Sequence, residues 1–202
     1  MSTLIITNQL ISAAANGDEN TVLSLLLTSK VNINGKAHNA NTALITAVNN
    51  NKESIVSLLL DKGADNSIKN NDGNTALICA VNKSNQSMVS LLLDKGSDIN
   101  IKNNGGWTAL ICAVYKNNES MVSLLLDRGA DINIQNIYGS TALMYAARDN
   151  KENIAALLLD RGADMNIKDN NGKSVFNITI NPCIISMLEN KRKLESQVNN
   201  FY

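Results

Sequence analysis

The sequence predicts an all-α fold in which helix-turn-helix units stack on one another. Three observations support this prediction: a period of about 33 residues, apolar residues at helical spacing in each period, and a glycine after each second helix. Repetition of this length is typical of solenoids, in which each unit packs only on its neighbours. We expect the 202 residues to form a single domain of this kind.

The period is visible in four segments that align without gaps: NTALITAVNNNKESIVSLLLDKGAD, NTALICAVNKSNQSMVSLLLDKGSD, WTALICAVYKNNESMVSLLLDRGAD and STALMYAARDNKENIAALLLDRGAD. They predict full repeats at 42–74, 75–107, 108–140 and 141–173, here numbered two to five. A weaker match before them predicts an N-terminal capping repeat at 8–41. A shortened match after them predicts a C-terminal capping repeat at 174–198, which Pro182 would open as a helix, and a tail at 199–202.

Each repeat is expected to contain two helices. The threonine at the start of the TAL segment, such as Thr75, is a good N-cap, and Leu77, Ala80 and Val81 follow at helical spacing. A residue in the left-handed conformation should end this first helix; the candidates are Asn51, Ser84, Asn117 and Asn150. The second helix is apolar around most of its circumference, so neighbouring repeats must cover it. Left-handed glycines should follow it at Gly63, Gly96, Gly129 and Gly162.

These residues resemble the ankyrin repeat pattern, approximately DxxGxTPLHLAAxxGxxxVVxLLLxxGADVN. The turn glycine of that pattern has four matches: Gly73, Gly106, Gly139 and Gly172. The resemblance implies an ankyrin-repeat solenoid with short β-turn or hairpin fingers and a concave, partner-binding surface of turn tips and first helices. TALI or TALM replaces TPLH here, so the proline and histidine that stiffen each repeat in the family are missing.

Function is expected at the positions that do not repeat. Repeats two and three offer mostly asparagine on the implied concave surface, with His38 just ahead of repeat two. Repeats four and five carry larger side chains there, and we predict that these bind a partner protein: Trp107, Tyr115, Lys116, Ile137, Tyr138, Arg148 and Asp149. Trp, Tyr and Arg often dominate interface energies. The alternative is that Trp107 and Tyr138 only stiffen the stack.

Two further sets of residues, each at one position in successive repeats (a repeat column), have other interpretations. Lysines recur just after the GAD-type loops and could form a basic ladder beside an aspartate column; the positions are Lys36, Lys69, Lys102, Gln135 and Lys168. Solvated charges that pair across repeats contribute little net energy. The resemblance also implies hydroxylation by an asparaginyl hydroxylase at four loop asparagines: Asn34, Asn100, Asn133 and Asn166.

The residues required for catalysis are scarce. His38 is the single histidine, so no triad or His-based metal site can be assembled from the chain. Cys79 and Cys112 share a repeat column and are expected to be core thiols, and Cys183 stands apart. No phosphate-binding or dinucleotide glycine pattern occurs. We expect no enzyme activity, no metal and no cofactor.

Composition limits the partners and the location. Eighteen basic residues balance 18 acidic ones, so no general attraction to nucleic acid is expected. No apolar run is long enough to span a membrane, and the first residues lack the features of a secretory signal. We expect a cytoplasmic protein. The asparagine-rich repeats are similar to those encoded by large DNA viruses or intracellular bacteria, which would place the protein in a host cytoplasm, acting on host proteins.

The leading hypothesis is a monomeric, non-enzymatic module that binds a protein partner through repeats four and five. The alternative is a self-assembling structural protein that uses exposed end repeats or an amphipathic last helix. The apolar residues of that helix are Ile184, Met187, Leu188, Leu194 and Val198.

Overall fold

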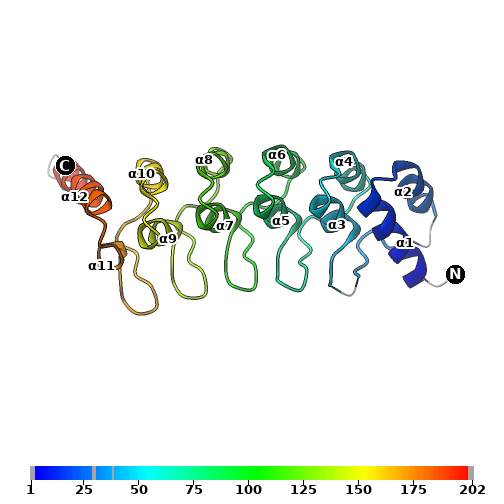
Figure 1. Ribbon diagram of the computed structural model, residues 1–202, viewed down its shortest axis with the longest axis horizontal. Helices are drawn as coiled ribbons and strands as arrows, with labels where there is room; N and C mark the ends of the chain where they lie inside the picture. The colour runs from blue at the N-terminus through cyan, green and yellow to red at the C-terminus, as the bar shows by residue number, and fades with distance from the viewer. Residues whose placement is uncertain (1–2, 29–30, 38, 200–202) are drawn as a thin grey trace. The chain divides into compact units, whose positions relative to one another are not determined.

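The computed structural model describes residues 3–28, 31–37 and 39–199 (Figure 1). The chain forms two compact units, Met1–Asn104 and Gly105–Tyr202. The first unit contains helices α1 (Thr3–Asn16), α2 (Glu19–Leu26), α3 (Ala43–Asn49), α4 (Glu53–Asp61), α5 (Ala76–Asn82) and α6 (Gln86–Asp94). The second contains α7 (Ala109–Tyr115), α8 (Glu119–Asp127), α9 (Ala142–Arg148), α10 (Glu152–Asp160), α11 (Val175–Ile178) and α12 (Pro182–Asn199).

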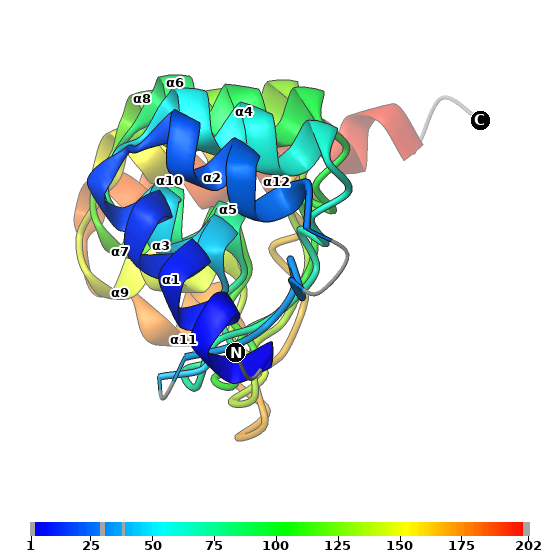
Figure 2. The same cartoon turned by 90° about the vertical axis from the view of Figure 1, so that its right-hand side faces the viewer.

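Within each unit the helices form two layers (Figures 1 and 2). In the first unit α1, α3 and α5 make an inner layer and α2, α4 and α6 an outer layer. The second unit has α7, α9 and α11 inside and α8 and α10 outside. The segment between a second helix and the next first helix, such as 128–141, projects beside the inner layer and is here called a finger. We call the surface formed by fingers and inner helices the inner surface.

The predicted all-α fold is confirmed, since no strand occurs among the described residues. The fingers are closed by backbone hydrogen bonds of the hairpin type. In 128–141, the N–H of Asn136 donates to the carbonyl of Ser140 at 3.0 Å and the N–H of Gly139 donates to that of Asn136 at 3.0 Å. Helix α1 begins at Thr3, ahead of residue 8, and α12 begins at Pro182 as expected.

Helix ends follow the chemistry that the sequence predicts. The hydroxyls of Thr42, Thr75, Thr108 and Thr141 accept the backbone N–H three residues on, at 3.2–3.4 Å. Left-handed residues end four inner helices, with φ of 54° or 56° at Asn51, Ser84, Asn117 and Asn150. The glycines that follow the outer helices have φ of 80–86°. These repeated devices fix where each helix starts and stops.

The core lies between the helices of successive repeats. Small residues in the inner helices let neighbouring helices approach closely. These residues are at most 1% exposed: Ala47, Ala80, Ala113 and Ala146. The outer helices α4, α6 and α8 each bury an apolar triplet, for example Ile55, Val56 and Leu59 in α4, all fully buried. Burial of each such side chain contributes about 1.5–3 kcal/mol. No repeat could bury these faces without a neighbour.

Polar side chains tie neighbouring fingers together. The Lys36 ammonium donates to the carbonyl of Lys69 at 3.1 Å, and the Gln135 amide donates to that of Lys168 at 2.9 Å. Two members of this column, Lys36 and Gln135, therefore bond to backbone carbonyls in the next repeat. Ion pairs also join successive repeats, between Asp61 and Lys95 and, at 2.6 Å, between Asp127 and Arg161. The pairs are partly exposed, so each contributes little to stability.

Candidate functional site

The aromatic residues of the chain all follow residue 104 in the sequence, and three of them lie together on the second unit. The ring of Trp107 contacts that of Tyr115 edge-on at 5.0 Å and that of Tyr145 at 5.1 Å. Tyr145 is 4% exposed, Trp107 is half-buried and Tyr115 is 56% exposed. We call these three rings, with the Arg148 guanidinium stacked on Tyr145, the ring cluster.

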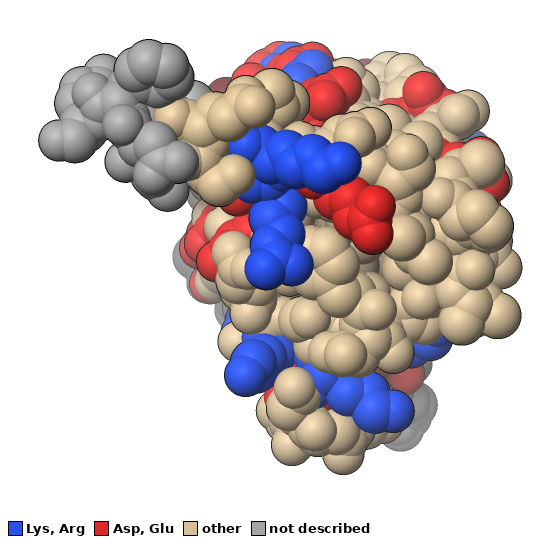
Figure 3. All heavy atoms as spheres, turned by 90° about the vertical axis from the view of Figure 1, so that its left-hand side faces the viewer, with Lys and Arg blue, Asp and Glu red and all other residues tan. Residues whose placement is uncertain are grey.

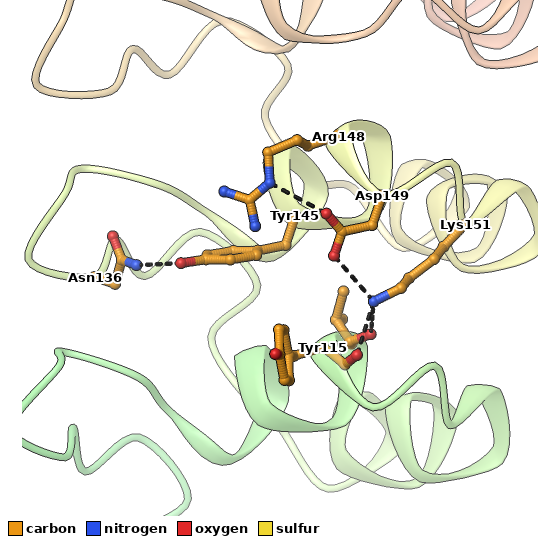
Figure 4. Close-up of polar contacts among 7 residues, drawn as sticks. Tyr115, Asn136, Tyr145, Arg148, Asp149 and Lys151 are labelled. Atoms are coloured by element: carbon orange, nitrogen blue, oxygen red, sulfur yellow. Dashed lines mark hydrogen bonds and ion pairs between the residues drawn. The ribbon is translucent and has the colours of Figure 1, made fainter.

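Tyr145 is the fixed centre of the ring cluster. Its hydroxyl accepts a hydrogen bond from the side-chain amide of Asn136 at 2.8 Å (Figure 4). The oxygen of the same amide accepts the N–H groups of Tyr138 and Ser140, so Tyr145 is tied to the finger. Sequence analysis missed Tyr145 because it occupies the column of Thr46, Cys79 and Cys112, which reads as core. A tyrosine at a position where the other repeats have small residues is the feature of the sequence that could have indicated it.

Charged residues connect the ring cluster to the neighbouring helices (Figure 4). The Arg148 guanidinium lies 4.3 Å from the centre of the Tyr145 ring, and its Nε donates to Asp149 at 3.1 Å. Lys151 Nζ donates to the other oxygen of Asp149 at 3.2 Å. Partial burial alone would raise the pKa of Asp149, but the hydrogen bonds and positive charges of Arg148 and Lys151 hold this pKa below its usual value.

Lys151 replaces a local helix cap with a contact to the preceding repeat. In the same column, Asn85 and Asn118 cap α6 and α8 by accepting backbone N–H groups at 3.0 Å. Lysine has no acceptor, and Lys151 instead donates to the carbonyls of Val114 and Tyr115 at the end of α7, at 2.9 and 2.8 Å. Its side chain is only 12% exposed, and its ammonium also lies 5.5 Å from the Tyr115 ring.

We expect Lys151→Met to lower the free energy of unfolding by about 1–3 kcal/mol, because two helix-end carbonyls and Asp149 lose a charged donor while the apolar stem remains. Urea unfolding of the full chain, followed by circular dichroism, measures the change. Lys52→Met is the matched control. Lys52 holds the equivalent position in the first unit, its ammonium makes no hydrogen bond to a described residue, and the expected loss is below about 0.5 kcal/mol. Equal losses in the two variants would contradict this account of Lys151.

The other predicted binding residues lie outside the ring cluster. Ile137 and Tyr138 are 55% and 63% exposed on the finger, where their carbonyls accept hydrogen bonds from the side chain and backbone of Asn170. Lys116 is exposed at the end of α7. The structure thus brings Trp107, Tyr115, Arg148 and Asp149 into one connected group, with Ile137 and Tyr138 on the finger that holds Asn136.

The inner surface of the first unit has a different chemistry. A hollow of about 580 Å³, here called the amide hollow, is lined by seven asparagines with Asp72, Cys79 and Lys83; the asparagines are Asn39, Asn41, Asn49, Asn70, Asn71, Asn74 and Asn82. The Asn41 Oδ1 atom is buried there and accepts no hydrogen bond from the residues that the structure describes. Asn82 holds the repeat position that Tyr115 holds in the next repeat. This pairing provides a matched control for substitutions on the second unit.

The predicted hydroxylation sites occupy the finger bases. Asn34 and Asn133 accept the N–H groups of Asp65 and Asp164 in the next repeat, both at 2.9 Å. Asn166 is exposed and Asn100 half-buried. Asn34 and Asn133 therefore already link neighbouring fingers through their oxygens, and modification of the four asparagines stays a prediction.

The thiols and the possible metal ligands form no reactive site among the described residues. Cys79 and Cys112 are buried and Cys183 is exposed, and no disulfide joins these three cysteines. Burial raises the pKa of the Cys79 thiol to about 11, so it stays protonated and unreactive at neutral pH. Within the described ranges no three His, Cys, Asp or Glu side chains gather closely enough to hold a metal ion, and His38 lies outside those ranges. None of the described helices has the length and apolar content that a membrane span requires.

Comparison with known proteins gives the family. The model for ankyrin repeats (3 copies) matches residues 10–103 and 96–169. The solved structure of EF0377, an ankyrin repeat protein, is 30% identical, with 91% of this chain and 97% of that chain covered and a TM-score of 0.80. An ankyrin repeat domain from Acinetobacter baumannii AYE (ABAYE2397) is 28% identical, with the same coverage and a TM-score of 0.81.

The ankyrin repeat domain of Bcl-3, a member of the IkappaB protein family, is 27% identical, with 90% of this chain and 97% of that chain covered and a TM-score of 0.68. No curated protein matches the sequence closely enough to count as a relative. Ankyrin repeats are in general non-enzymatic scaffolds for protein–protein interaction. On the match to the family model and the similarity to these structures, the chain belongs to the ankyrin repeat family.

Proposed function

We propose that this protein is a non-enzymatic module that binds a partner protein through the inner surface of its second unit, centred on repeats four and five. The ring cluster is the observation that supports this proposal most. Trp, Tyr and Arg contribute large contact areas at low entropic cost, and such residues dominate binding energies when they are held in place beforehand. Here Tyr145 fixes both Trp107 and Arg148 before any partner arrives.

The alternative, that Trp107 and Tyr138 only stiffen the stack, accounts for part of the geometry. Trp107 packs on two rings and is half-buried, as a stiffening residue would be. Tyr115, Ile137 and Tyr138 are each more than half exposed, however. Packing within the chain gives no reason for three large exposed apolar side chains on one unit, whereas a partner surface would cover them.

Affinity capture with the full chain as bait, followed by mass spectrometry, tests the proposal. Bait carrying Tyr115→Ala or Tyr138→Ala is expected to lose at least about 90% of the partner, because removal of a hot-spot ring typically costs 2 kcal/mol or more. Trp107→Ala should lose the partner too. The melting temperature of each bait is measured in parallel, since a loss of binding in a destabilised bait says nothing about contact.

Asn82→Ala is the control bait, because Asn82 occupies the place of Tyr115 in the preceding repeat and its side chain makes no hydrogen bond to a described residue. It should retain the partner fully. A partner that is lost with Asn82→Ala and retained with both tyrosine variants would refute the assignment to the second unit.

Self-assembly stays a second candidate because of the N-terminal repeat. Its two helices and the residue after the second expose Leu4, Ile5, Leu23 and Leu27, the last at 83%. The amphipathic last helix supports self-assembly less. Ile184 and Leu188 are fully buried, Met187 is partly buried, Leu194 is 59% exposed, and the side chain of Val198 lies outside the described residues. Light scattering across a range of concentrations decides: we expect a concentration-independent monomer, and growth with concentration would favour assembly.

The proposal includes a cytoplasmic location, with no cofactor, no metal, no nucleic acid and no membrane as partner. The equal numbers of basic and acidic residues support the exclusion of nucleic acid. The partner is expected to be a protein that shares this compartment, and a host protein if the chain has a viral or bacterial origin.

A further inference from the structure

We propose that Arg148 and Lys173 form an anchor for a single carboxylate of the partner, so that the second unit selects an acidic protein segment. This inference rests on the proposed function, because it names the chemistry of the partner that the ring cluster binds. Arg148 and Lys173 line the same hollow of about 280 Å³ on the inner surface of the second unit, together with Ser140, Asn171 and Asp169. Arg148 ends helix α9, and Lys173 belongs to the finger that leads into α11.

The Arg148 guanidinium is held in position, and its two terminal nitrogens are available to a ligand. Its plane stacks on Tyr145, and its Nε donates to Asp149. Both supports are themselves fixed, Tyr145 by Asn136 and Trp107, and Asp149 by Lys151. The two terminal nitrogens donate to no described residue, and the side chain is 51% exposed. A planar guanidinium presented in this way matches a carboxylate through two parallel hydrogen bonds.

The acidic groups around the hollow are already engaged. Asp169 Oδ1 accepts the N–H groups of Asn171 and Lys173, each at 2.9 Å, which shapes the finger. Asp149 is shared by Arg148 and Lys151. The exposed ammonium of Lys173 has no carboxylate partner among the described residues. The hollow can therefore accept an anion without breaking an existing ion pair.

The charge count favours a carboxylate over a phosphate or a nucleic acid. The lining of the hollow carries one excess positive charge, because Arg148 and Lys173 lie there with Asp169. Asp149 and Lys151, which form an ion pair next to Arg148, add no net charge. One carboxylate neutralises this excess, whereas a phosphate dianion would leave net negative charge beside two aspartates. In the end view of Figure 3, Lys and Arg side chains lie near α12 and on the finger side, with Asp and Glu side chains among them.

The ring cluster indicates which side chain should lie next to the acidic residue in the partner segment. Tyr115 is exposed beside Trp107, and Trp107 contacts the Tyr145 ring over which the Arg148 guanidinium lies. A segment whose Asp or Glu side chain binds Arg148 would place a neighbouring aromatic or apolar side chain against these rings. The ligand class is thus a short acidic segment with an aromatic or large apolar residue next to the acid.

NMR titration of the 15N-labelled full chain with the capped peptide EEFEE tests the inference. The Arg148 Nε–Hε signal and the Lys173 amide signal are expected to shift, with the Trp107 indole signal moving in parallel. The matched peptide QQFQQ should bind about tenfold more weakly, because it lacks the charged acceptors. Raising the salt from about 0.05 M to about 0.5 M should weaken EEFEE alone, since ions screen exposed charges.

Arg148→Gln and Lys173→Gln should each weaken EEFEE binding about fivefold to tenfold, whereas Asn82→Ala should leave it unchanged. Lys173 is exposed and makes no side-chain hydrogen bond to a described residue, so its variant should fold normally even if Arg148→Gln does not. Equal shifts with EEFEE and QQFQQ would overturn the inference, as would shifts confined to signals of α12. Stronger shifts of the Arg148 signal with inorganic phosphate than with EEFEE would assign the anchor to phosphate instead.

Failure of this inference can be told apart from failure of the proposed function. If the captured partner depends on Tyr115 and Tyr138 while EEFEE leaves Arg148 unmoved, the carboxylate anchor is wrong and the binding surface stands. If EEFEE shifts Arg148 and Lys173 while the partner is insensitive to both tyrosines, the anchor exists and the assignment of partner binding to the ring cluster is wrong.

Discussion

Replacing Tyr145 with alanine is expected to lower the free energy of unfolding by about 3–5 kcal/mol. The ring is 4% exposed, contacts Trp107 and carries the Arg148 guanidinium over its face. Its removal leaves a cavity that the backbone of a stacked repeat cannot readily close. It also removes the acceptor of the buried Asn136 amide, which costs further free energy. Urea unfolding of the full chain gives the value.

Tyr145→Phe separates the ring from its hydroxyl. The ring stays in place, so only the hydrogen bond to Asn136 is lost and the expected change is about 1–2 kcal/mol. Partner binding should survive this substitution, because Trp107 and Arg148 keep their support. A Tyr145→Ala variant as stable as the wild type would show that the ring cluster does not hold the second unit together.

Gly139→Ala is expected to destabilise the protein by about 3 kcal/mol or more, for two reasons that add. Gly139 has a φ of +74°, a left-handed conformation that costs a residue with a Cβ atom about 1–2 kcal/mol. An added Cβ would also lie 2.6 Å from the backbone nitrogen of Asn170 in the next finger. Because that neighbour is backbone held by hydrogen bonds to Ile137 and Tyr138, it cannot move aside without separating the fingers.

Gly129→Ala is the matched control for the finger contact. Gly129 has a φ of +85°, and an added Cβ would meet nothing within 4 Å. Only the conformational cost of about 1–2 kcal/mol remains. Thermal or urea unfolding of the two variants compares them directly, and the difference between them measures the close approach of the fingers. Equal losses would mean that the fingers can separate at no cost.

The fold was predictable because its determinants recur. The N-cap threonines, the left-handed link residues and the glycines after the outer helices each appear four times at one spacing, and all hold the predicted conformation. Four copies of each feature therefore predict the same helix boundaries. Repetition also predicted the buried alanines and the buried thiols of Cys79 and Cys112.

The site was less predictable because its contacts join different columns of the repeat. Trp107, Tyr115 and Arg148 stand out within their own columns, but no column comparison shows that Tyr145 connects them. Asn136 is one asparagine among many, and the role of Lys151 depends on the contact of its ammonium with carbonyls at the end of α7. Some side chains occur in one repeat only, and their contacts depend on the directions in which they point. The period of the sequence does not predict these directions.

Hydrogen–deuterium exchange of the full chain, with and without its captured partner, tests most directly whether the inner surface of the second unit is the binding surface. The account predicts slower exchange on binding at amides in 105–116 and 136–149, with the amides that border the amide hollow in the first unit unchanged. Slower exchange confined to residues 39–83, with the ring cluster unaffected, would contradict it.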